Sequence, residues 1–184
     1  MMTTTHAGMG ATLGALLAPV APELAAVAAF GGILGGVFPD LDVFFEHRKT
    51  LHYHDYYWAV AVIAGLVAVV WPTPWTVGLT AFFVSAGLHS VTDILGGGLG
   101  LRPWLADDER GVYSHREGRW IPPRRWVRYD GAPEELLPTV LFSAVPFLVF
   151  DGLLRALVVV GLVISMCYVA LRKQLPDLYE RYVA

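Results

Sequence analysis

Charged residues are scarce in this chain of 184 residues, where they make up only 16% of the sequence. Soluble domains average about 25% charged residues, so the usual hydrated surface is not expected here. Basic residues are not in excess either, because 13 Lys and Arg stand against 16 Asp and Glu for a net charge of −3. This balance argues against a basic nucleic-acid-binding surface, and we expect no nucleic-acid partner.

Cysteine is almost absent as well. Cys167 has no second cysteine to pair with, which excludes a disulfide or a cysteine-based metal cluster within these residues. The amino-terminal segment lacks Lys and Arg, the first of which is Arg48. Because secretory signal peptides begin with a positively charged region, we expect this segment to be retained.

Hydrophobic residues, in contrast, make up 55% of the chain, and the mean hydropathy is +0.53. The apolar segments are Thr5–Leu17, Leu24–Phe38, Tyr56–Trp71, Trp75–Leu95, Leu136–Phe150 and Leu153–Leu171. A spanning helix needs about 17–25 apolar residues, so several of these segments are long enough to cross a bilayer. We predict an all-α integral membrane protein with a single domain over residues 1–184, formed by about six helical segments in three hairpins. The first segment is short, and both a crossing and a re-entrant path remain open for it.

Basic residues predict the orientation of these hairpins. They follow the second segment, fill the polar stretch 98–135 and follow the last segment, with Arg155 as the exception. If each apolar segment crosses once, these regions share one side, which the positive-inside rule makes cytoplasmic. We therefore expect a multi-pass protein of the cell membrane with both termini and residues 98–135 in the cytoplasm. Asp151 and Arg155, four residues apart, are expected to pair at the opposite end.

The polar stretch 98–135 is rich in Arg and acidic residues and also holds Trp104, Trp120 and Trp126. Such a tryptophan content is typical of an ordered cap and not of a flexible linker. The alternation at 119–121 and 125–129 weakly favours short extended pieces.

Ionisable residues gather at the cytoplasmic ends of the predicted helices. The candidate metal ligands are His6, Asp40, Asp42, His47, His52, His89 and Asp93. His89 and Asp93 are four residues apart and therefore lie on one helix face. Imidazole and carboxylate groups together suit zinc, manganese or iron, and seven candidates suggest two metals, or one metal with supporting residues. We expect one or two divalent ions, with zinc favoured over manganese or magnesium.

Each candidate also has an ordinary structural explanation. Asp40 follows a proline and would suit a turn or a helix cap. His54 fits an ordinary interfacial histidine, and His115 fits a solvated loop. The His89 and Asp93 pair is harder to explain in this way, because ionisable groups inside an apolar span require a partner or a metal.

The order of these motifs resembles a known family, the membrane-bound metal-dependent hydrolases also described as LexA-binding, inner-membrane-associated hydrolases. That family has an N-terminal His, then Pro-Asp-x-Asp, then His-Arg-Gly-x-Thr-His, then His-x-x-x-Asp. The matching positions here are His6, Pro39–Asp42, His47–His52 and His89–Asp93, with Lys49 and Leu51 departing from the pattern. The resemblance extends from residue 6 to about residue 105.

The resemblance implies a hydrolase, distantly similar to zinc phospholipases C and related nucleases, acting on a phosphate ester such as a phospholipid head group. A metal-activated water would attack the substrate. Asp40 and Asp42 would be catalytic as well as metal-binding, and Arg48 would hold an anionic oxygen. The expected partners are membrane lipid and a small-molecule or lipid phosphate substrate.

Two other functions remain open. A transporter or ion pathway would use the same Asp and His residues, although such sites lie near the midplane between repeated halves, and no repeat is evident here. A non-catalytic, metal-stabilised membrane protein would instead present residues 98–135 to a partner.

Overall fold

The computed structural model describes residues 1–182. Within them the regular secondary structure is helical apart from one small sheet, and loops connect the elements. The six apolar helices are α1 (Thr3–Leu17), α2 (Pro22–Val37), α3 (Tyr56–Val70), α4 (Pro74–Thr92), α5 (Leu136–Val149) and α6 (Gly152–Leu171). The shorter elements are η1 (Phe38–Phe44), η2 (Asp93–Leu95), η3 (Pro103–Leu105), β1 (Val112–Ser114), β2 (Arg119–Ile121), η4 (Pro133–Glu135) and α7 (Leu175–Tyr182). The prediction of an all-helical chain is confirmed.

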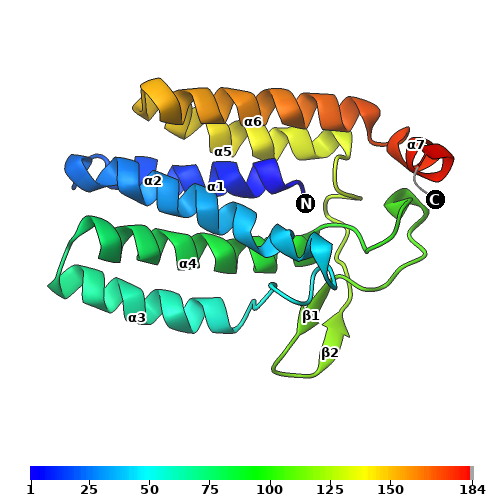
Figure 1. Ribbon diagram of the computed structural model, residues 1–184, viewed down its shortest axis with the longest axis horizontal. Helices are drawn as coiled ribbons and strands as arrows, with labels where there is room; N and C mark the ends of the chain where they lie inside the picture. The colour runs from blue at the N-terminus through cyan, green and yellow to red at the C-terminus, as the bar shows by residue number, and fades with distance from the viewer. Residues whose placement is uncertain (183–184) are drawn as a thin grey trace.

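The six apolar helices lie side by side and pair as three antiparallel hairpins (Figure 1). Their three short turns all lie at one end of the bundle. The longer polar connections, with β1, β2 and α7, lie at the other end (Figure 1). Within residues 1–182, three stretches could cross a membrane by length and composition, namely Pro22–Phe44, Pro74–Leu95 and Gly152–Leu171, and α3 is a shorter apolar helix.

Close backbone contacts hold the centre of the bundle together. A Cβ atom added at Gly32 of α2 would lie 2.1 Å from the carbonyl oxygen of Gly10 in α1, and one added at Gly36 would lie 2.4 Å from the carbonyl oxygen of His6. Only glycine leaves room for this approach, which is also typical of tightly packed helix pairs in membrane proteins. The result is that the start of α1 and the end of α2 lie directly against each other.

The polar cap is ordered, and most of it was not predicted in detail. The extended piece at 119–121 is confirmed as β2, which pairs antiparallel with β1, whereas residues 125–129 form no strand. Helix α7 was not predicted. Arg102 joins it to the cap, with its Nη1 2.6 Å from Oε1 of Glu180 and its Nη2 2.9 Å from Oδ1 of Asp177.

The predicted ion pair of α6 is present, with Nη2 of Arg155 at 2.8 Å from Oδ1 of Asp151. It belongs to the turn between α5 and α6, at the end of the bundle away from the polar cap (Figure 1).

Candidate metal centre

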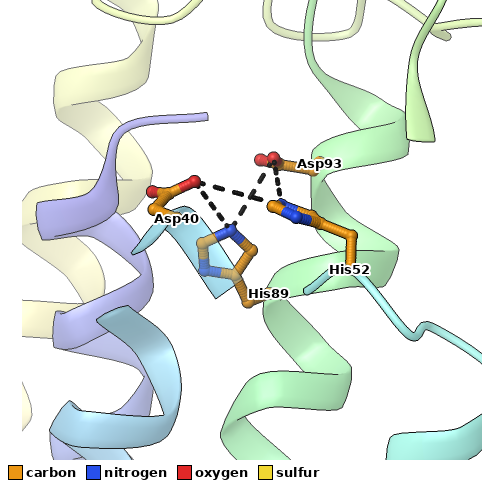
Figure 2. A group of neighbouring side chains, drawn as sticks. All are labelled: Asp40, His52, His89 and Asp93. Carbon is orange, nitrogen blue, oxygen red and sulfur yellow. Dashed lines mark ion pairs between the residues drawn. The ribbon is translucent and has the colours of Figure 1, made fainter. Parts of the chain in front are cut away.

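Four of the seven predicted ligands converge at the capped end of the bundle. Asp40 comes from η1, His52 from the loop before α3, His89 from the last turns of α4, and Asp93 from the start of η2. One ligand atom from each residue lies within 4.8 Å of those of the other three. Figure 2 shows the four side chains pointing toward one another, with His89 and Asp93 on the same helical stretch, Pro74–Leu95.

The spacing of these atoms suits a single tetrahedral ion. Oδ1 of Asp40 lies 3.3 Å from Nε2 of His89 and 3.9 Å from Nε2 of His52. Oδ2 of Asp93 lies 3.4 Å from Nε2 of His52 and 3.7 Å from Nε2 of His89. Ligand atoms at about 2.0–2.2 Å from a tetrahedral zinc ion are roughly 3.3–3.6 Å apart, so the four Asp–His distances are close to that geometry, and the remaining pairs lie within 4.8 Å.

Three of the four ligand atoms are buried without a hydrogen-bond partner. They are Nε2 of His52, Nε2 of His89 and Oδ2 of Asp93, and the last of these has an ion-pair contact with Nε of Arg48 at 3.1 Å. A buried polar atom left unpaired costs about 1–3 kcal/mol, so the two imidazole nitrogens that face one point require an explanation. A divalent cation between them would satisfy all three, and these residues therefore fit a metal ion.

Both imidazole rings are fixed by a hydrogen bond at Nδ1, the nitrogen that does not face the group. Nδ1 of His52 donates a hydrogen bond to Oδ2 of Asp42 at 2.9 Å, and Nδ1 of His89 donates to the carbonyl oxygen of Gly36 at 2.6 Å. With the proton on Nδ1, the lone pair of each Nε2 atom points toward the centre of the group. Such outer contacts fix the tautomer and the ring direction of metal-binding histidines.

Asp42 lies behind His52 and does not face the four converging atoms. Its Oδ2 accepts the hydrogen bonds of His52 and of the Leu51 backbone N–H, and its Oδ1 accepts one from Nδ1 of His47 at 2.8 Å. Both carboxylate oxygens are therefore occupied. This placement favours an orienting role for Asp42 and His47 over the direct ligation that the sequence suggested.

His6 lies beside the group of four. Its ring stacks on that of His89 with the centroids 3.7 Å apart, and its Nε2 is 3.0 Å from Oδ1 of Asp93, the oxygen that faces away from His52. The amino group of Met1 lies 2.5 Å from the same oxygen. His6 therefore contacts Asp93 and His89 without sharing their common point.

Arg48 reaches the group from a strained turn. Its φ of 59° is in the left-handed region, and the buried guanidinium places Nε 3.1 Å from Oδ2 of Asp93 while Nη1 donates to the carbonyl oxygen of Gly97. The β1–β2 hairpin supports this turn, since the Tyr113 backbone N–H donates to the carbonyl oxygen of Arg48 at 3.0 Å.

His115 supports the same loop, although its sequence context suggested a solvated residue. Its Nε2 donates to the carbonyl oxygen of Lys49 at 2.7 Å, and its ring stacks on Tyr53.

Thr3 is a second residue that sequence reasoning missed. Its hydroxyl donates a short hydrogen bond to Oδ2 of Asp40. Neither residue belongs to a motif, and only the folded chain brings them to the site. His54 lies apart from the group and pairs with its neighbour Asp55.

The electrostatics of His52 follow from its two acidic neighbours. Burial by itself lowers the pKa of an imidazole, but the nearby carboxylates of Asp42 and Asp93 outweigh burial and raise the pKa of His52 above its ordinary value. The buried carboxylates of Asp42 and Asp93 therefore stabilise positive charge at this ring.

A cavity of about 380 Å³ opens beside the group, with Asp40, His47 and Arg48 on its wall. A molecule in this cavity would therefore reach both Asp40 of the group and the buried Arg48. Comparisons of the chain with family models, curated proteins and solved structures found no match.

Proposed function

We propose that the chain is a multi-pass membrane protein that binds a divalent metal ion, zinc before manganese or magnesium, and hydrolyses a phosphate ester such as a phospholipid. The observation that carries this proposal is the convergence of two buried imidazole nitrogens without a hydrogen bond, Nε2 of His52 and of His89, with one carboxylate oxygen each from Asp40 and Asp93. A single point of convergence accommodates one ion. A second ion would need Oδ1 of Asp93 and Nε2 of His6 as ligands, and these two atoms already pair with each other at 3.0 Å.

The cavity beside the group supports catalysis over a purely structural metal. Asp40 is the most exposed of the four residues and also lines the cavity, so the open side of the metal site would face a bound molecule. Structural zinc sites are closed by four protein ligands, whereas catalytic sites keep a position for water or substrate, and zinc can expand to five ligands.

When bound, the ion would lower the pKa of a coordinated water to about 7 and polarise the phosphoryl group. Arg48 would bind a non-bridging phosphate oxygen, because this residue lines the cavity and its guanidinium lies beside Asp93. Asp42 would keep Nε2 of His52 free for the metal. In the reaction the water oxygen forms a bond to phosphorus, the ester P–O bond breaks, and the leaving oxygen takes up a proton.

Membrane insertion is supported by the outer surface of the bundle. Large apolar side chains are exposed along α3 and α5, such as Val69, Val70 and Leu148. An exposed apolar surface of this extent is typical of contact with lipid. The loops that hold the basic residues lie at the same end as the candidate metal centre, so the positive-inside rule would place that end in the cytoplasm.

A transporter remains the alternative of another class. The ionisable cluster lies at one end of the bundle and not at its middle, which favours an enzyme. The third possibility is a protein whose metal only stabilises the fold. Such a protein would bind the metal but would not hydrolyse a substrate.

The test is a turnover assay on the protein purified in detergent. Hydrolysis of bis(p-nitrophenyl) phosphate and of phospholipids in mixed micelles should require the metal, disappear with a chelator and return with zinc. Asp40→Asn should abolish turnover, whereas Asp55→Asn, which alters an Asp–His pair outside the group, should retain it. Bound metal without turnover would indicate the structural alternative, and ion flux in proteoliposomes would indicate the transporter.

A further inference from the structure

The lining of the cavity beside the candidate metal centre is polar in one part and aliphatic in another. Asp40 and Arg48 line the cavity beside the group, and α6 contributes Ile164, Tyr168 and Arg172 to its lining. These three side chains are spaced four residues apart and therefore lie along one face of α6. The lining changes from aliphatic at Ile164, through a phenol, to a guanidinium at the end of the helix.

The polar end of this face is held rigidly. Nε of Arg172 lies 3.1 Å from Oδ2 of Asp130, and the Tyr168 hydroxyl donates to the same oxygen at 2.5 Å. Arg172 is buried there although it is charged, and its guanidinium lies over the ring of Trp104. Arg48 and Arg172 thus line a single cavity as two buried basic residues, and Asp130 lines it as well.

The aliphatic end belongs to the outer surface of the bundle. Val43 of η1 and Ile164 of α6 both line the cavity, yet 61% and 51% of their surfaces are exposed. Phe44 and Phe45, which follow Val43, are also largely exposed. Ile164 lies within Gly152–Leu171, a stretch that is long and apolar enough to span a membrane, so this side would face acyl chains and not water.

We propose that the cavity is a head-group pocket that opens sideways to the bilayer between η1 and α6, and that its ligand is a membrane lipid with a phosphate ester in its head group. The phosphate enters between Arg48 and Arg172, and the acyl chains stay outside against Val43 and Ile164. A volume of about 380 Å³ suits a small head group and excludes the chains. The inference rests on the proposed function for the reaction, but the binding of the lipid can be measured without turnover.

The first experiment measures binding alone. The protein is reconstituted in phosphatidylcholine vesicles that contain phosphatidic acid with a diazirine near the top of one acyl chain. Crosslinks mapped by mass spectrometry should concentrate at residues 43–45 and around residue 164, and excess unlabelled phosphatidic acid should suppress them. Crosslinks spread evenly over the exposed faces of α3 and α6, or unaffected by competition, would overturn the pocket.

The second experiment compares a lipid with a soluble ester. Ile164→Trp narrows the opening, and Val163→Trp places the same ring on a neighbouring exposed position outside the cavity lining. The ratio of kcat/KM for phosphatidic acid to that for bis(p-nitrophenyl) phosphate should fall about tenfold in Ile164→Trp and stay unchanged in Val163→Trp. An equal ratio in the two variants would contradict the sideways opening.

The two experiments separate this inference from the proposed function. Crosslinks at the opening that unlabelled lipid suppresses, without hydrolysis of any ester, would support the lipid pocket and contradict the proposed enzymatic activity. Hydrolysis of the soluble ester without such crosslinks would support the enzymatic activity and contradict the lipid pocket.

Discussion

Asp42 and His52 form a buried pair in which Oδ2 of the carboxylate accepts a 2.9 Å hydrogen bond from Nδ1 of the ring, so that Nε2 is left facing Asp40 and Asp93. The pair assigns different tasks to the two aspartates of Pro39-Asp40-Leu41-Asp42. Asp40 presents an oxygen to the centre of the group, and Asp42 holds the ring that stands beside it.

The pair predicts how Asp42→Asn behaves. The amide can no longer accept hydrogen bonds with both atoms, so the ring of His52 loses its fixed tautomer, but the four ligand atoms remain. We expect zinc affinity to fall by about 10–100-fold with one ion still bound at saturation, as measured by competition with a chromophoric chelator. Asp55→Asn is the matched control and should leave the affinity unchanged. A complete loss of the site in a folded Asp42→Asn protein would instead make Asp42 a direct ligand.

Gly32 predicts a packing effect outside the site. In Gly32→Ala the new Cβ would lie 2.1 Å from the carbonyl oxygen of Gly10, so α1 and α2 must separate. We expect overpacking to lower the free energy of unfolding by about 1–3 kcal/mol, which thermal unfolding in detergent would detect. Gly161→Ala in α6 is the control, because its new Cβ meets nothing within 4 Å. Equal stability of both variants would show that the α1–α2 contact is not tightly packed.

The orientation in the membrane can be tested by cysteine labelling. Cys167→Ser supplies a cysteine-free background, in which Val20→Cys probes the α1–α2 turn and Arg116→Cys probes the β1–β2 hairpin; both positions are exposed. In intact cells, an impermeant maleimide should label the cysteine at position 20 and reach the one at position 116 only after lysis. Labelling of both positions from one side would contradict the hairpin topology.

The sequence predicted the apolar helices and the end of the bundle where the polar residues meet. It did so because helix length and the position of Asp and His within each segment are set locally. The division of tasks between Asp40 and Asp42 was not predictable, since it depends on how η1 turns after α2. The contact of Gly36 with His89 was also hidden, because it uses a backbone carbonyl that any residue has.

The support of the Arg48 loop by His115 depends on long-range folding, since the β1–β2 hairpin must first pack against that loop. Helix α7 escaped prediction for another reason. It is short and polar, and it is joined through Arg102 to Asp177 and Glu180, so hydropathy gives no signal for it.

The central claim is that Asp40, His52, His89 and Asp93 bind one divalent ion, and anomalous diffraction at the zinc edge tests it most directly. Crystals of the protein purified with zinc should show one strong peak, with Nε2 of both histidines and one oxygen of each aspartate about 2.0–2.2 Å away. The peak should vanish in a folded His89→Ala protein and persist in His54→Ala. A wild-type crystal without a peak at this point, or with zinc bound only at His54 and Asp55, would contradict the account.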